Sequence, residues 1–170
     1  MKKVVIIGSP GAGKSTFATK LAKQSGLPLI HLDYYYHDTS HDYEHDKEAW
    51  RRRVKELIKG KEWITDGNYC STYDIRLPAA DTIIFLNIPK RIVLWRIMKR
   101  RITYHKRTRP DMSSDWEEKA DWEFLKYVWG FKKSYSSDIK MTLENYKDKD
   151  VFIVNSPNEA KILFKQLSRP

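Results

Sequence analysis

Residues 8–15 have the residue types and the spacing of a loop that binds phosphate groups. The segment reads Gly-Ser-Pro-Gly-Ala-Gly-Lys-Ser and matches the pattern G-x-x-x-x-G-K-[ST], in which glycines let backbone N–H groups approach phosphate oxygens without a Cβ in the way. Lys14 is expected to reach the β- and γ-phosphates of a nucleoside triphosphate, and the hydroxyl of Ser15 is expected to bind Mg²⁺. The residues predicted to contact the nucleotide, taken as ATP, are Gly8, Gly11, Ala12, Gly13, Lys14, Ser15 and Thr16.

Two aspartates are expected at the ends of neighbouring strands, beside this loop. Asp66 follows the apolar run 63–65, and Asp33 follows the run 28–32. An acid in the position of Asp66 is typical of the residue that organises Mg²⁺ in such sites, often through metal-bound water. Asp33 is predicted to order the metal, or to bind an acceptor hydroxyl and take its proton as a catalytic residue. The alternative for both is an ordinary cap or turn aspartate, which is common at strand ends.

Positive charge is concentrated in one segment. Residues 90–109 contain nine lysines and arginines and no acidic residue, in a chain whose net charge is +10. Arg96 and Arg100 are four positions apart, so a helix would place them on one face, and paired guanidinium groups suit a phosphoryl group in transfer. Both are predicted to be catalytic, with Arg107 and Arg109 in a loop that closes over the site. The alternative is a solvated basic helix face.

Histidines recur at every fourth position of the polar segment 34–46, as His37, His41 and His45. Histidines at i and i+4 on a helix can share a zinc ion. The chain contains one cysteine, so no thiol is available within this segment to anchor a metal. A solvated or acceptor-facing loop is therefore favoured over a zinc site.

The composition is that of a globular domain of ordinary size, with 170 residues of which 41% are hydrophobic and 32% charged. A single cysteine forms no internal disulfide, which favours a reducing compartment. No segment is apolar enough over sufficient length to span a membrane. The expected location is the cytoplasm.

Apolar strands alternate with helical periodicity along the chain. Five strands are predicted, at 4–7, 28–32, 63–65, 82–88 and 151–154. Helices are predicted after residue 15 and at 47–59, 90–104, 116–129, 131–147 and 158–167. This alternation predicts a five-stranded parallel sheet with helices on both faces, a three-layer α/β/α fold in one domain over 1–170. Ligands of such sheets bind at the carboxyl ends of the strands.

Three of these features together resemble the adenylate-kinase-like P-loop kinases. They are the loop 8–16, the strand-end pair Asp66-Gly67 and the basic helix 91–101. In those kinases an Arg-x-x-x-Arg helix leads into a mobile lid, which the resemblance implies at 101–116 of this chain. The lid would be short, without a four-cysteine zinc site.

A closer resemblance, over nearly the whole chain, is to the bacterial DNA topology modulation protein (FlaR-like) group of P-loop kinase-like proteins. It rests on the segments 31–33, 66–69, 76–77, 80–86, 107–112 and 121–125. The group's motifs do not name an acceptor. Adenylate kinases have Phe-Pro-Arg after Asp-Gly, whereas this chain has Asn68-Tyr69; Arg76 is predicted to replace the arginine that binds the acceptor phosphate.

The leading prediction is an ATP- and Mg²⁺-dependent phosphotransferase whose small-molecule acceptor is a nucleoside or nucleotide. One alternative is an NTP-binding regulator of DNA topology that contacts nucleic acid through residues 90–109, a role that the group's name suggests. Another alternative is an NTPase that transfers the γ-phosphate to water. No membrane partner is expected.

Overall fold

The central element of the computed structural model is a five-stranded sheet in which all neighbouring strands are parallel. The structure describes residues 1–38, 40–103 and 135–167, and only the helical backbone of residues 100–103. The strand order is β2-β3-β1-β4-β5. The strands are β1 (Lys3–Gly8), β2 (Leu29–His31), β3 (Trp63–Asp66), β4 (Thr82–Leu86) and β5 (Asp150–Val154). The predicted five-stranded parallel sheet is confirmed.

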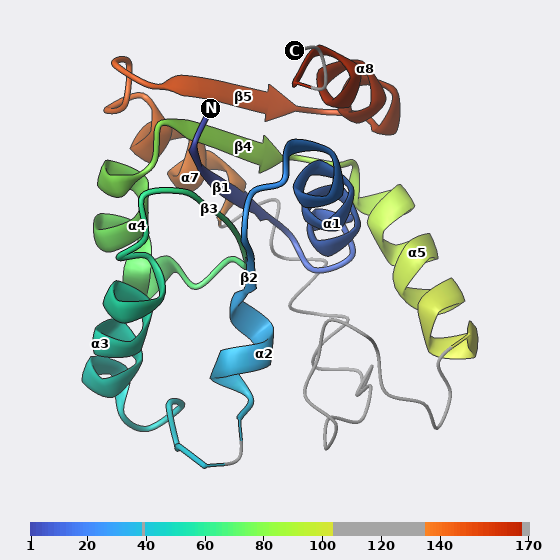
Figure 1. The fold of residues 1–170 in the computed structure, drawn as a ribbon. Coiled ribbons are helices and arrows are strands. Elements are labelled where there is room, and N and C mark those ends of the chain that lie inside the picture. Colours follow the sequence, from blue (N-terminus) through green and yellow to red (C-terminus); the bar gives the residue numbers. More distant parts are fainter. Residues whose placement is uncertain (39, 104–134, 168–170) are drawn as a thin grey trace.

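Helices cover both faces of the sheet, as Figure 1 shows. One face carries α1 (Lys14–Ser25), α5 (Lys90–Thr103) and α8 (Pro157–Leu167). The other carries α4 (Tyr73–Ala79) and α7 (Ser136–Leu143), together with the end of α3 (Lys47–Leu57). Two short elements, α2 (Leu32–Tyr36) and the 3₁₀ helix η1 (Cys70–Thr72), follow the carboxyl ends of β2 and β3. The three-layer α/β/α prediction is therefore confirmed.

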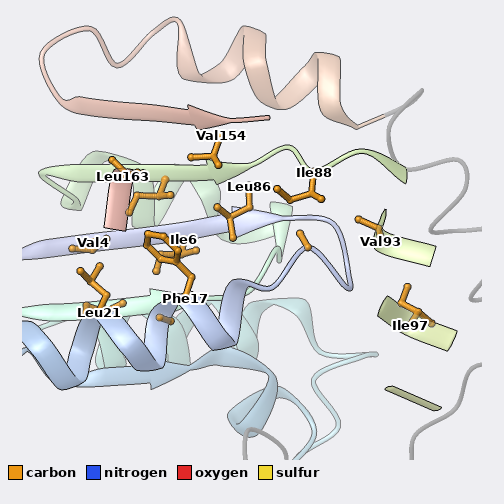
Figure 2. Packing of buried hydrophobic residues seen from close by; sticks show 14 residues of the cluster. Val4, Ile6, Phe17, Leu21, Leu86, Ile88, Val93, Ile97, Val154 and Leu163 are labelled. Carbon is orange, nitrogen blue, oxygen red and sulfur yellow. The ribbon is translucent and has the colours of Figure 1, made fainter. Parts of the chain in front are cut away.

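The core consists of two apolar layers, one on each side of the sheet, because alternate strand residues point to opposite faces. Val4 and Ile6 pack with α1, α5 and α8, whereas Val5 and Ile7 pack with α4 and α7. Figure 2 shows the first layer, which extends from the strands to Val93 on α5. The strands are apolar on both faces, as expected of a parallel sheet covered by helices.

The prediction for residues 28–36 was wrong in one respect. The second strand ends at His31, and α2 begins at Leu32, so Asp33 lies in the first turn of a helix and not at the strand end. Leu32 is completely buried in a third apolar cluster with Trp50 and Val54 of α3. The N–H of His37 donates to the carbonyl of Asp33 (3.2 Å) and closes the helical turn. The helix predicted at 116–129 lies outside the described residues.

Candidate functional site at the carboxyl edge of the sheet

The phosphate loop connects β1 to α1 and requires glycine at several positions. Gly11 and Gly13 have φ angles of +77° and +97°, a left-handed conformation that residues with a Cβ rarely adopt. Space is also limited, because a Cβ on Gly11 would lie 2.8 Å from Cγ1 of Ile97 on α5. The loop is therefore packed directly under α5, and its glycines serve both the backbone conformation and this close approach.

Two cations of the predicted site donate hydrogen bonds to carbonyls of this loop. Nζ of Lys14 donates to the carbonyl of Ser9 (3.1 Å). Nη1 of Arg96, which comes from α5, donates to the carbonyl of Ala12 (2.8 Å). The fold thus places two side chains, 82 positions apart in the sequence, on the same short loop. Positive charge at the amino-terminal end of a helix favours the binding of an anion there.

Asp66 is buried at the end of β3, next to the strand that leads into the loop. It lies opposite Ile6 of β1 and opposite His31 of β2 in the strand registers. Only 3% of Asp66 is exposed. Its Oδ1 lies 2.6 Å from Nδ1 of His31, so the imidazole N–H donates to the carboxylate. A charged group at this depth requires such a partner.

Asp33 has a tyrosine as its partner. The hydroxyl of Tyr69 donates to Oδ1 of Asp33 (2.8 Å). Burial of Tyr69, together with the negative charge of Asp33, raises the pKa of the phenol well above its ordinary value, so Tyr69 remains a hydrogen-bond donor. The carboxylate of Asp33 is therefore held in one orientation on α2 while part of it stays accessible.

Arg76 lies inside the protein, with none of its surface exposed. Its guanidinium donates to Oγ1 of Thr72 and to the carbonyls of Gly67, Asn68 and Tyr69, at distances of 2.9–3.2 Å. Burial lowers the pKa of this arginine, although nearby groups, Tyr73 first, act in the opposite direction. Arg76 thus holds the loop that follows β3, and its predicted direct contact with an acceptor stays a prediction that its burial does not favour.

Several predicted site residues cannot be placed. Arg100 belongs to the backbone of α5, but its side chain lies outside the described part. Arg107, Arg109 and nearly all of the expected lid at 101–116 lie outside the described residues as well. Ser15 and Thr16 lie in the first turn of α1, where Ser15 is half-buried and Thr16 is exposed.

The histidine segment shows local contacts. Nδ1 of His45 lies 2.9 Å from Oδ2 of Asp42, and His41 stacks on Tyr43 with 5.2 Å between the ring centroids. Within the described residues, no group of three or more His, Cys, Asp or Glu side chains is arranged to hold a metal ion.

Sequence reasoning gave no role to His31 or Tyr69. Both belong to the segments 31–33 and 66–69 that carry the family resemblance. The strand register could have identified His31, because parallel strands that end at the same edge place their last residues side by side. Tyr69 had no comparable signal, since its contact depends on the path of the chain after Gly67.

Comparison with solved structures identifies the fold. The shikimate kinase of Acinetobacter baumannii, solved with shikimate, superposes with a TM-score of 0.63 at 18% identity, covering 98% of this chain and 90% of that one. A deoxyadenosine kinase from M. mycoides, solved with dCTP, gives a TM-score of 0.54 at 17% identity, covering 97% and 98%. The chain has the adenylate-kinase-like P-loop kinase fold.

Sequence comparison finds two partial relatives, and no protein-family model matches the chain. The protein YqaC of Bacillus subtilis strain 168, whose description is "Uncharacterized protein", is 33% identical over 102 residues, which are 58% of this chain and 56% of YqaC. The shikimate kinase of Parabacteroides distasonis is 38% identical over 64 residues, 34% of this chain and 37% of that enzyme. The chain thus spans little more than half, or less, of the curated relatives it matches.

None of the described helices is both long and apolar enough to cross a lipid bilayer.

Proposed function

We propose that this protein is an ATP- and Mg²⁺-dependent phosphotransferase that acts on a small-molecule acceptor, with a nucleoside or nucleotide as the expected class. Lys14 and Arg96, with Arg100, would neutralise the charge that develops on the γ-phosphoryl group. Asp33 would bind the acceptor hydroxyl and take its proton. This assignment agrees with the kinase fold of the structural neighbours. It also gives an activity to the FlaR-like group that the sequence resembles.

The observation that carries this proposal is the hydrogen bond between Arg96 and the phosphate loop. Nη1 of Arg96 lies 2.8 Å from the carbonyl of Ala12 and 3.3 Å from the position that a Cβ would take on Gly13. A guanidinium at this place meets whatever anion binds to the loop. Arg96 therefore adds a second cation, besides Lys14, to the loop that the proposal assigns to the phosphates.

The residues present fit a magnesium ion. Mg²⁺ in kinases is usually held by one or two protein oxygens together with substrate phosphates and water. Ser15 offers a hydroxyl at the start of α1 and Asp66 a carboxylate at the end of β3, and these two elements pack against each other. The cation would neutralise charge on the β- and γ-phosphates, while Ser15 and Asp66 hold it and Lys14 holds the phosphates.

An acceptor panel tests the proposal directly. Purified protein is incubated with γ-labelled ATP and Mg²⁺ against nucleosides, nucleoside monophosphates and small polyols, including shikimate. We expect one class to become phosphorylated in step with ADP release. Release of ADP with transfer of phosphate only to water would contradict the proposed transferase activity and support the NTPase alternative.

Arg96→Ala is expected to lower kcat by about 10²-fold, because one charge-assisted contact to the transferring group is lost. Arg96→Lys should recover part of this loss, since an ammonium keeps the charge but lacks the planar fork. Steady-state kinetics with ATP check the result. Arg91→Ala is the matched control, because Arg91 is exposed on the same helix. Equal losses in both variants would show a general charge effect and not a role of Arg96.

Tyr69→Phe is expected to lower kcat/KM for the acceptor by about 10-fold, the value of a hydrogen bond to a charged group, because the Asp33 carboxylate loses its donor. The KM for ATP should stay within about twofold. Tyr146→Phe, at a half-buried tyrosine packed against the apolar layer of α4 and α7, serves as control. A loss confined to the KM for ATP would contradict a role of Asp33 at the acceptor.

The DNA-binding alternative stays a prediction, as does the cytoplasmic location. Of the basic segment 90–109, Arg91 and Lys99 are exposed on α5, whereas Arg96 faces the phosphate loop. Affinity for labelled DNA that falls by roughly 0.7–0.9 log units per log unit of salt for each phosphate contacted would support this alternative.

A further inference from the structure

His31 and Asp66 form the closest polar contact at the proposed metal site. His31 is the last residue of β2 and lies directly opposite Asp66 in the parallel register with β3. Nδ1 and Oδ1 are 2.6 Å apart, and the side chains are 22% and 4% exposed respectively. The imidazole is thus positioned by the sheet itself, and the contact requires no loop to adopt a particular conformation.

This contact leaves the two carboxylate oxygens of Asp66 in different environments. Oδ1 accepts from His31, whereas Oδ2 accepts no hydrogen bond within the described part of the chain. A single strong hydrogen bond also restricts rotation of the carboxylate about its Cβ–Cγ bond. One oxygen is therefore fixed, and the other stays available to a cation or to the water bound to it.

We propose that His31 is a positioning residue that orients Asp66 for the divalent cation. This inference rests on the proposed function, because it assumes that Asp66 organises the metal of a bound nucleotide. Removal of a partner that orients a ligating carboxylate typically lowers metal affinity by 10–100-fold. His31 makes this contribution without contacting the metal, the phosphates or the acceptor.

The alternative is that His31 only satisfies a buried carboxylate. In that case its removal would destabilise the protein and weaken binding of every ligand of the site alike. The two roles are separated by a measurement that reports on the metal alone. Electron paramagnetic resonance of Mn²⁺ gives the free metal concentration directly, and metal-free ATP binding in EDTA gives the affinity of the loop itself.

The test compares His31→Ala with His31→Asn in the full chain, with ATP present. The alanine variant should bind Mn²⁺ about 10-fold more weakly than the unsubstituted protein. The asparagine variant should stay within about threefold, because its amide can donate from nearly the same place as Nδ1. ATP affinity in EDTA should be unchanged in both. His45→Ala is the control, since His45 has the same type of contact with Asp42 on the surface.

Two results would overturn the inference: Mn²⁺ affinity of the alanine variant equal to that of the unsubstituted protein, or an equal loss in metal-dependent and metal-free ATP binding. Failure of the proposed function has a different signature, because the unsubstituted protein itself would then bind ATP no better with Mn²⁺ than without it. If His31→Ala fails to fold, the asparagine variant decides: Mn²⁺ binding weakened 10-fold or more despite normal ATP binding in EDTA would also contradict the proposal.

Discussion

Lys14→Ala is expected to lower phosphoryl transfer by about 10³-fold, the upper end of the range for removing one preorganised donor to a developing charge. The side chain lies on the phosphate loop, where Nζ donates to the carbonyl of Ser9, and no other residue of that loop carries a positive charge. The loss should appear in kcat more than in the KM for ATP, because the lysine is expected to contact the phosphates whose charge changes during transfer. Initial rates with saturating ATP and the acceptor identified by the panel measure it.

Lys20→Ala is the matched control for this experiment. Lys20 lies on the same helix, α1, and is exposed, so its removal changes the net charge by the same amount without touching the loop. Its rate should equal that of the unsubstituted protein. Activity of Lys14→Ala close to that of the unsubstituted protein would contradict the proposal that phosphoryl transfer occurs at this loop.

Arg76→Ala should lower the free energy of unfolding by about 3–5 kcal/mol, because a large buried side chain is removed and buried acceptors lose their donor. The substitution leaves a cavity and deprives Thr72 and the carbonyls of Gly67, Asn68 and Tyr69 of a donor. Arg76→Lys should recover only a minor part, because an ammonium group does not reproduce the planar fork. Urea unfolding followed by circular dichroism measures the change.

The same variant distinguishes two roles for Arg76. Arg52→Ala, at an exposed position of α3, should change stability by less than about 0.5 kcal/mol and controls for the loss of charge. A stable Arg76→Ala protein with a raised KM for the acceptor would favour the direct acceptor contact predicted from the sequence. A destabilised protein whose remaining folded fraction keeps its KM would favour a purely positioning role.

The parts of the fold that could be predicted are those that depend on short, contiguous sequence patterns. The phosphate loop is contiguous, with glycines at the positions that need left-handed backbone and Lys14 at a fixed distance from them. The longer strands, such as β1 and β4, are short apolar runs rich in β-branched residues, which favours strand over helix. The parallel arrangement and the two covering layers follow from the alternation of strands with helical segments along the chain.

Other features depend on contacts between distant residues. Helix α2 has five residues, too few to show helical periodicity, and it forms because Leu32 is buried against α3. Arg76 was predicted to bind the acceptor phosphate. Its burial depends on carbonyls of a loop whose shape the sequence does not reveal. The pairing of His31 with Asp66 arises from the register of two strands separated by more than thirty residues.

The packing of α5 against the phosphate loop has a thermodynamic consequence. Gly11 leaves space for Ile97, and a Cβ there would also lie 3.1 Å from the carbonyl of Val93, so the shape of the loop and the position of α5 are set together. A ligand that favours one loop conformation must therefore favour one position of α5 by the same coupling free energy, and the reverse also holds. Substitution of Ile97, which is buried in the apolar core, should then alter nucleotide affinity through this linkage.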